Sequence, residues 1–170
     1  MHRQGITGGY LPLAATLATE EVYSAFLGTT TDKRTFFHGH TYTGNPLACA
    51  AAMASLDVFE KERTLERLKP VMAALAKKLE RVAELPHVGE IRRRGMMAGI
   101  ELVKDRRTKE EYPYGDRIGH KVCLAIREKG ILLRPLGGVV VLMPPLSLTV
   151  QEAEWLGDSV HDAIAQVTGG

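Results

Sequence analysis

The sequence is poor in aromatic residues and has almost no excess of charge of either sign. Phenylalanine, tyrosine and tryptophan make up 6% of its 170 residues, and the formal net charge is +2. A nucleic-acid surface needs a basic face, commonly with interleaved aromatic side chains. We therefore expect no nucleic-acid partner, and we expect the short basic cluster Arg92–Arg94 to be a solvated strand end.

The sequence also has little cysteine and no long apolar run. No stretch reaches the about 18 apolar residues that a membrane-spanning helix needs. Cys49 and Cys123 are the only cysteines, and they lack the spacing of metal ligands, which is typical of a reducing compartment. Both lie in apolar, helix-like stretches and are predicted to be buried. We expect a cytoplasmic protein with no membrane partner.

Hydrophobic residues are nevertheless 45% of the chain, enough for a domain with a core. In the first third, the run Leu11–Ala18 predicts a buried strand leading into a helix that Thr19 caps and that ends near Gly28. Asn45, followed by Pro46, predicts the start of a long helix. Its first turns are rich in alanine, which would let another backbone segment approach closely.

The remainder, from about residue 64, has the pattern of a small α/β domain. A helix to about Leu85 is predicted by apolar residues at spacings of three and four. These residues are Leu65, Leu68, Met72, Leu75, Leu79 and Val82. Residues 88–94 and 96–103 are predicted strands, and the second, GMMAGIELV, is apolar enough to be buried on both faces.

The last third predicts two further helices and two short strands. The helices are expected over 116–129 and 150–167, the first ending at Gly130. The strands lie on either side of Gly137–Gly138. No internal repeat or low-complexity segment interrupts this order.

Two polar features point to anion binding. In HGHTYTGNP, Thr41 stands beside glycines just before a helix start, where an anion could bind; alternatively, Thr41 and Thr43 only satisfy local backbone groups. Arg134 lies in the apolar run ILLRPLGG and either meets an anionic ligand or extends to solvent at a strand end. His38 and His40 have no further ligands near them in the sequence, so no metal is expected.

Several segments together resemble one family. QGITGGYLPLAATLATEEVY, FFHGHTYTGNPLACAAAMASLDVFE, GIELV and GILLRPLGGVVVLMPPL occur in the order and spacing of the C-terminal portion of class III pyridoxal-phosphate aminotransferases. The resemblance implies an α/β chain, the C-terminal part of a type I pyridoxal-phosphate-dependent transferase fold. Residues 1–45 would be the end of the large cofactor domain, 46–63 a connecting helix, and 64–170 the small C-terminal domain.

The same resemblance implies roles for individual residues. Thr41 would bind the phosphate of pyridoxal 5'-phosphate in the neighbouring subunit of a homodimer, with His40 beside it. Gly39 would contact substrate, and Arg134 would bind the carboxylate of a keto acid. The family's cofactor-holding lysine directly precedes the Gly-x-Thr-Gly-Gly turn, and here that position is Gln4, so no catalytic residue is assigned.

The biotin-pathway branch of the family matches best. It implies amino transfer to 8-amino-7-oxononanoate, giving 7,8-diaminononanoate, with S-adenosylmethionine or lysine as donor. Because an amide is not nucleophilic, we expect this chain to be inactive alone. The chain would be either a late-started product or a decayed copy. The alternatives are a non-catalytic α/β fragment, a subunit that completes a partner's site, or another class III omega-aminotransferase.

Overall fold

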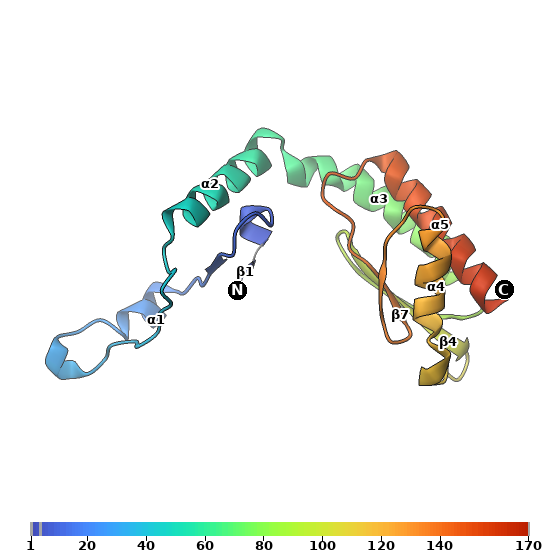
Figure 1. Cartoon of the computed structure of the whole chain (residues 1–170), viewed down its shortest axis with the longest axis horizontal. Helices are drawn as coiled ribbons and strands as arrows, with labels where there is room; N and C mark the ends of the chain where they lie inside the picture. The colour runs from blue at the N-terminus through green and yellow to red at the C-terminus, as the bar shows by residue number, and fades with distance from the viewer. Residues whose placement is uncertain (1, 4, 170) are drawn as a thin grey trace. The chain divides into compact units, whose positions relative to one another are not determined.

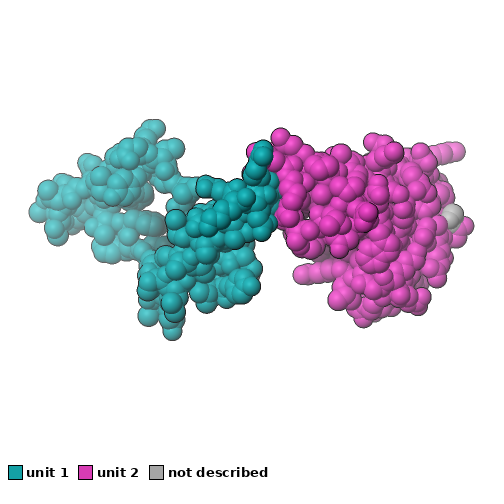
Figure 2. All heavy atoms as spheres, turned by 90° about the horizontal axis from the view of Figure 1, so that it is seen from above, with its two compact units in different colours: residues 1–64 teal, residues 65–170 magenta. Residues whose placement is uncertain are grey.

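The computed structural model describes residues 2–3 and 5–169 and divides the chain into two compact units (Figures 1 and 2). Unit 1 is Met1–Thr64 and unit 2 is Leu65–Gly170. Among the described residues, no helix combines the length and the apolar character that crossing a membrane requires.

Unit 1 is built from short elements and one long helix. They are β1 (His2–Arg3), η1 (Gly5–Thr7), β2 (Ala14–Ala15), α1 (Glu20–Ser24), η2 (Thr30–Asp32) and α2 (Pro46–Lys61). β1 and β2 pair antiparallel, with Arg3 opposite Ala14. The predicted buried strand over Leu11–Ala18 is wrong: only two residues pair, and Leu17 is 88% exposed. A two-residue partner strand cannot extend the pairing or cover an apolar run.

Helix α1 begins where the sequence indicated and ends sooner. The Thr19 hydroxyl accepts a hydrogen bond from the N–H of Val22 at 3.3 Å, which confirms the predicted cap. The helix stops at Ser24 rather than near Gly28. None of its residues is buried, so no packing extends it beyond its first turns.

Helix α2 confirms its predicted start and the purpose of its alanines. The side-chain oxygen of Asn45 accepts hydrogen bonds from the N–H groups of Leu47 and Ala48, at 3.0 and 3.2 Å. Ala48 and Ala52 are buried, and α2 contacts η1, the turn that holds the buried Thr7. Small side chains on α2 therefore let the glycine-rich turn lie against the helix.

Unit 2 is a helix-covered antiparallel sheet. Its elements are α3 (Thr64–Ala83), β3 (Val88–Arg94), β4 (Met97–Asp105), β5 (Glu110–Glu111), η3 (Tyr114–Asp116), α4 (Ile118–Arg127), β6 (Arg134–Leu136), β7 (Val139–Leu142) and α5 (Val150–Thr168). The strand order is β3-β4-β7-β6, and β5 pairs with β4. Ile100 in the middle of β4 lies opposite Ile91 on one side and Val140 on the other.

The core of unit 2 lies between one face of this sheet and helices α3, α4 and α5 (Figure 1). Alternate residues of β4, namely Ala98, Ile100 and Leu102, are buried, while those between them are only half-buried or exposed. On the other face Val103 is buried, but Met97 is 50% exposed and Gly99 and Glu101 are half-buried. The prediction that this strand is buried on both faces is therefore wrong over most of its length, because the helices cover a single face of the sheet.

The apolar stripe of α3 is confirmed except at its start. Leu65 is 69% exposed, whereas Val71, which the spacing left out, is buried with Leu68 and Leu75. The prediction that both cysteines are buried holds only for Cys123, where burial raises the pKa of the thiol.

Candidate functional site

The feature with the clearest ligand chemistry is the hairpin of β6 and β7. Leu136 pairs with Val139 across the two-residue turn Gly137–Gly138. Gly137 has a φ of 58°, in the left-handed region that such tight turns require and that glycine adopts without strain. Arg134, at the start of β6, pairs with Val141.

Arg134 is exposed, and within the described part of the chain its guanidinium forms no hydrogen bond or ion pair. It lines a groove of about 840 Å³ whose other walls are mainly apolar and include Leu132, Met143 and Trp155. A guanidinium binds a carboxylate through two parallel hydrogen bonds. The groove therefore fits a carboxylate attached to an apolar body.

Glu152 also lines this groove, but its carboxylate is already engaged. It accepts hydrogen bonds from the backbone N–H and the hydroxyl of Thr149, both at 2.8 Å, at the start of α5. These bonds hold the pKa of Glu152 below its ordinary value. Arg134 is thus the charged group of the groove that is available to a ligand.

A second cavity, of about 490 Å³, lies on the other side of the hairpin, and Leu136 lines both cavities. Its polar residues include Glu101, Tyr112, Arg117 and His120. Glu101 accepts a hydrogen bond from Arg92 at 2.9 Å, so part of the charge here is already paired. This mixture of charges does not define one class of ligand.

The turn that precedes α2 separates the two alternatives for its threonines. The Thr43 hydroxyl accepts a hydrogen bond from the N–H of His40 at 2.9 Å and so satisfies the local backbone. The Thr41 hydroxyl is exposed and has no hydrogen-bond partner among the described residues. Beside them, a side chain added at Gly39 would meet nothing within 4 Å. Thr41 is therefore the hydroxyl available to a ligand.

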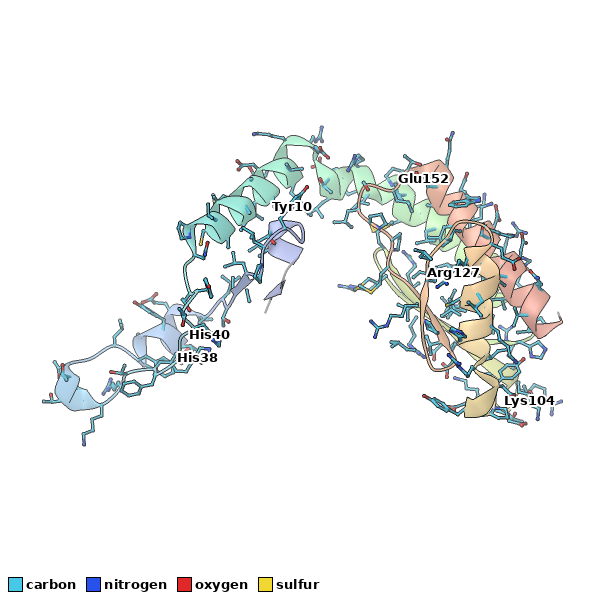
Figure 3. The ribbon with its side chains drawn as sticks, in the orientation of Figure 1. Tyr10, His38, His40, Lys104, Arg127 and Glu152 are labelled. Atoms are coloured by element: carbon cyan, nitrogen blue, oxygen red, sulfur yellow. The ribbon has the colours of Figure 1, made fainter. Side chains whose placement is uncertain are left out.

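Aromatic rings line the approach to this turn. The rings of His38 and His40 lie 5.5 Å apart, edge to face, and the Phe36 ring lies 5.5 Å from that of His38 (Figure 3). Within the part of the chain that the structure describes, no group of three or more histidine, cysteine or acidic side chains gathers around a common point. These histidines contact neighbouring rings and remain exposed to solvent.

The residues of the chain fit only part of a pyridoxal-phosphate site. The open Thr41 hydroxyl suits a phosphate oxygen. The glycine-rich turn is internally bonded, since the Thr7 hydroxyl donates to the carbonyl of Leu11 at 2.6 Å. Gln4, which the resemblance places where the family has its lysine, lies outside the described residues. Both described cavities lie in unit 2, and Thr41 lies in unit 1.

Two groove residues, Met143 and Trp155, were not identified from the sequence. Strand alternation could have placed Leu136 on the same side of β6 as Arg134, because the two are two residues apart. No local pattern could have added Trp155, which comes from α5 and reaches the groove only through tertiary packing.

Comparison with known proteins covers almost the whole chain. The family model "Aminotransferase class-III" matches residues 2–164. The adenosylmethionine-8-amino-7-oxononanoate aminotransferase of Nitratidesulfovibrio vulgaris is 62% identical over 97% of this chain and 30% of its own length. That of Methanocaldococcus jannaschii is 52% identical over 96% of this chain and 35% of its own length.

Solved structures agree with these relatives. The crystal structure of the Methanocaldococcus jannaschii enzyme matches with a TM-score of 0.92 at 51% identity, over 96% of this chain and 37% of that chain. A PMP-bound aminotransferase from Vibrio fluvialis matches with a TM-score of 0.88 at 28% identity, over 98% of this chain and 37% of that chain. The chain spans about a third of the length of these relatives. Its fold is part of the α/β fold of pyridoxal-phosphate-dependent transaminases, and the chain belongs to the class III aminotransferase family.

Proposed function

We propose that the chain is the C-terminal part of an adenosylmethionine-8-amino-7-oxononanoate aminotransferase. The observation that carries this proposal is the 52–62% identity, over 96–98% of the chain, to five relatives that all bear that name. The whole enzyme would transfer an amino group to 8-amino-7-oxononanoate, giving 7,8-diaminononanoate in cytoplasmic biotin biosynthesis, with S-adenosylmethionine or lysine as donor.

We assign residues to this reaction as follows. Arg134 binds the carboxylate of the acceptor, and the apolar groove receives part of its aliphatic chain. Thr41, with His40 beside it, binds the cofactor phosphate across a homodimer interface, and Gly39 lies against substrate. When bound, the cofactor supplies the electron sink that amino transfer needs. Residues 1–45 belong to the large domain, 46–63 form the connecting helix, and 64–170 form the small domain.

Gln4 favours a second candidate, a chain that does not catalyse alone. The nitrogen lone pair of an amide is delocalised into its carbonyl, so Gln4 cannot replace a lysine amine as a nucleophile. Such a chain would serve as a subunit that completes the site of a partner. A different omega-aminotransferase activity is less well supported, since the (S)-enantioselective omega-transaminase from Thermomicrobium roseum is 34% identical.

Two chimaeras and the chain itself test the proposal. In the Methanocaldococcus jannaschii enzyme, the matching segment is replaced by residues 5–170 of this chain, or by residues 4–170. The two chimaeras differ only in whether Gln4 replaces the relative's own residue. We expect formation of 7,8-diaminononanoate, followed by mass spectrometry, from the first chimaera only, and none from the 170-residue chain alone.

The results separate the candidates. A folded first chimaera that ignores 8-amino-7-oxononanoate but aminates another ketone would replace the proposed substrate. Activity of the second chimaera, or of the chain alone, would show that Gln4 does not block the reaction.

A further inference from the structure

The position of Arg134 depends on very little direct bonding. Its guanidinium has no partner among the described residues, so the path of β6 fixes only the point from which the side chain extends. β6 is three residues long and lies at the edge of the sheet, where β7 is its only neighbour in the strand order of the described sheet. Pro135, at its centre, has no N–H to donate to a partner strand. A strand this short needs a second support.

Helix α4 provides that support at Gly119. Gly119 is buried in the first turn of α4. A Cβ built there would lie 2.5 Å from the carbonyl oxygen of Gly137 and 3.1 Å from the Cβ of Pro135. Both are held in the hairpin and cannot rotate away as the end of a flexible side chain could. The backbone of α4 therefore lies directly against the hairpin at Gly119.

The alternation of side chains along β6 connects this contact to the groove. Pro135 faces α4, so its neighbours Arg134 and Leu136 face the opposite way, and both line the groove. A side chain at position 119 would push Pro135 and the Gly137 turn away from α4. That shift would move Arg134 with them, because the two residues are adjacent in one short strand.

We propose that Gly119 is a positioning residue: by admitting the β6–β7 hairpin against α4, it sets where Arg134 presents its guanidinium to the acceptor carboxylate. This inference rests on the proposed function, in which Arg134 binds that carboxylate. Gly119 itself touches no ligand. Its effect passes through Pro135 and the Gly137 turn.

The chain offers a matched control at Gly157. This residue is also a buried helical glycine, and a Cβ added there would collide with the Cβ of Lys78. Here α5 lies against α3, and the nearest neighbours of the added Cβ belong to Lys78 rather than to the hairpin. Gly119→Ala and Gly157→Ala should therefore both lower the melting temperature, although alanine is intrinsically the better helix former. Only Gly119→Ala should change carboxylate binding.

The first test uses the 170-residue chain with hexanoate as the probe. NMR titration follows backbone amides of β6 and β7 and the side-chain Nε–H of Arg134. We expect Arg134→Gln to abolish binding, and Gly157→Ala to leave it within twofold. Gly119→Ala should weaken it about tenfold and change the Nε–H shift, since losing one hydrogen bond to a charged group has about that effect. The proposal is overturned if the Gly119→Ala chain binds hexanoate as tightly as the parent chain does. It is also overturned if Gly119→Ala raises the melting temperature, or if the parent chain does not bind hexanoate.

The second test uses the active chimaera described above. Gly119→Ala should raise the KM for 8-amino-7-oxononanoate about tenfold and leave the single-turnover rate with the amino donor unchanged. If Arg134→Lys impairs use of the acceptor but Gly119→Ala does not, the inference fails and the proposed function stands. If the chimaera is inactive, the proposed function fails, and the hexanoate titration still decides the role of Gly119.

Discussion

The two units differ in how far they bury large apolar side chains. Leu75 of α3 is fully buried in unit 2, whereas Phe37 of unit 1 is 93% exposed. Unit 2 packs its apolar residues between a sheet and three helices, so its own sequence completes its core. In unit 1 the described buried residues are small, namely Thr7, Ala48, Ala52 and Thr64, while Tyr10, Leu17 and Tyr42 are largely exposed. The relatives are about three times as long. This difference indicates that the exposed apolar residues of unit 1 are suited to packing against polypeptide other than these 170 residues.

Limited proteolysis gives the strongest test of this difference between the two units. We expect trypsin to cut residues 1–40 faster than the helices of unit 2 by roughly a hundredfold or more, because opening free energies range from near zero to the full stability of a unit. Mass spectrometry identifies the sites, and the exposed turn Arg106–Lys109 is the control for a loop on a packed unit. Equal protection of residues 1–40 in a chain shown to be a monomer would contradict the expectation.

Truncation of one large apolar side chain in each unit tests the same point energetically. Leu75→Ala should lower the free energy of unfolding by about 2–5 kcal/mol, because it leaves a cavity in a closed core. Phe37→Ala should change it by less than about 0.5 kcal/mol, since its ring already lies in solvent. Urea unfolding followed by the fluorescence of Trp155, the single tryptophan, measures unit 2. Similar losses in this transition from both substitutions would show that the stability of unit 2 depends on unit 1.

Within unit 2, Arg134→Lys should separate ligand binding from stability. In the active chimaera, acceptor binding should weaken by about 2–3 kcal/mol, because lysine cannot form the two parallel hydrogen bonds of a guanidinium. The half-reaction with the amino donor should change less, provided that the donor's own carboxylate is held elsewhere. The melting temperature without substrate should hardly move, since the guanidinium has no partner within the described residues. A large drop in melting temperature with unchanged acceptor affinity would make Arg134 a structural residue.

The accuracy of the sequence predictions depends on how local each signal is. Strand β3 was predicted at its observed bounds, and the caps at Thr19 and Asn45 were correct, because turns, caps and periodicity are local. The run Leu11–Ala18 was mistaken for a strand because it is apolar. Within unit 1, however, its apolar side chains have no layer of described residues to pack against. The predicted burial of Leu65 and of Cys49 was wrong for a related reason. Periodicity identifies the apolar face of a helix, but it does not show how far along the helix other elements pack against that face.

The candidate site was predictable only as separate residues. Arg134 stood out as one charge in an apolar run, and Thr41 as a hydroxyl beside glycines. The groove around Arg134 joins β6 and β7 to α5, so Trp155 could not be connected with it from spacing alone. Gly119 gave no signal in the sequence. Its importance comes from the distance to Gly137, which only the packed hairpin defines.

Each unit has a capping box, and we expect the contribution of these boxes to stability to be small. Glu152 accepts hydrogen bonds from Thr149 at the start of α5, and Asp32 accepts them from Thr29 at η2. In both, these bonds hold the pKa of the carboxyl below its ordinary value. A carboxyl whose pKa is lower in the folded state stabilises that state fully above its unfolded pKa. The stabilisation is lost as pH falls through the folded pKa.

The unfolding midpoint of unit 2, followed by Trp155 fluorescence, should therefore fall as pH decreases from 6 to 3, and Glu152→Gln should remove part of that fall. The amide still accepts hydrogen bonds, but it carries no charge that acid can neutralise. Asp32→Asn is the matched control, and it should leave the pH dependence of the Trp155 transition unchanged, because Asp32 belongs to unit 1. If Asp32→Asn alters that transition as much as Glu152→Gln does, the two units unfold together, and the contrast between a self-sufficient unit 2 and a dependent unit 1 must be abandoned.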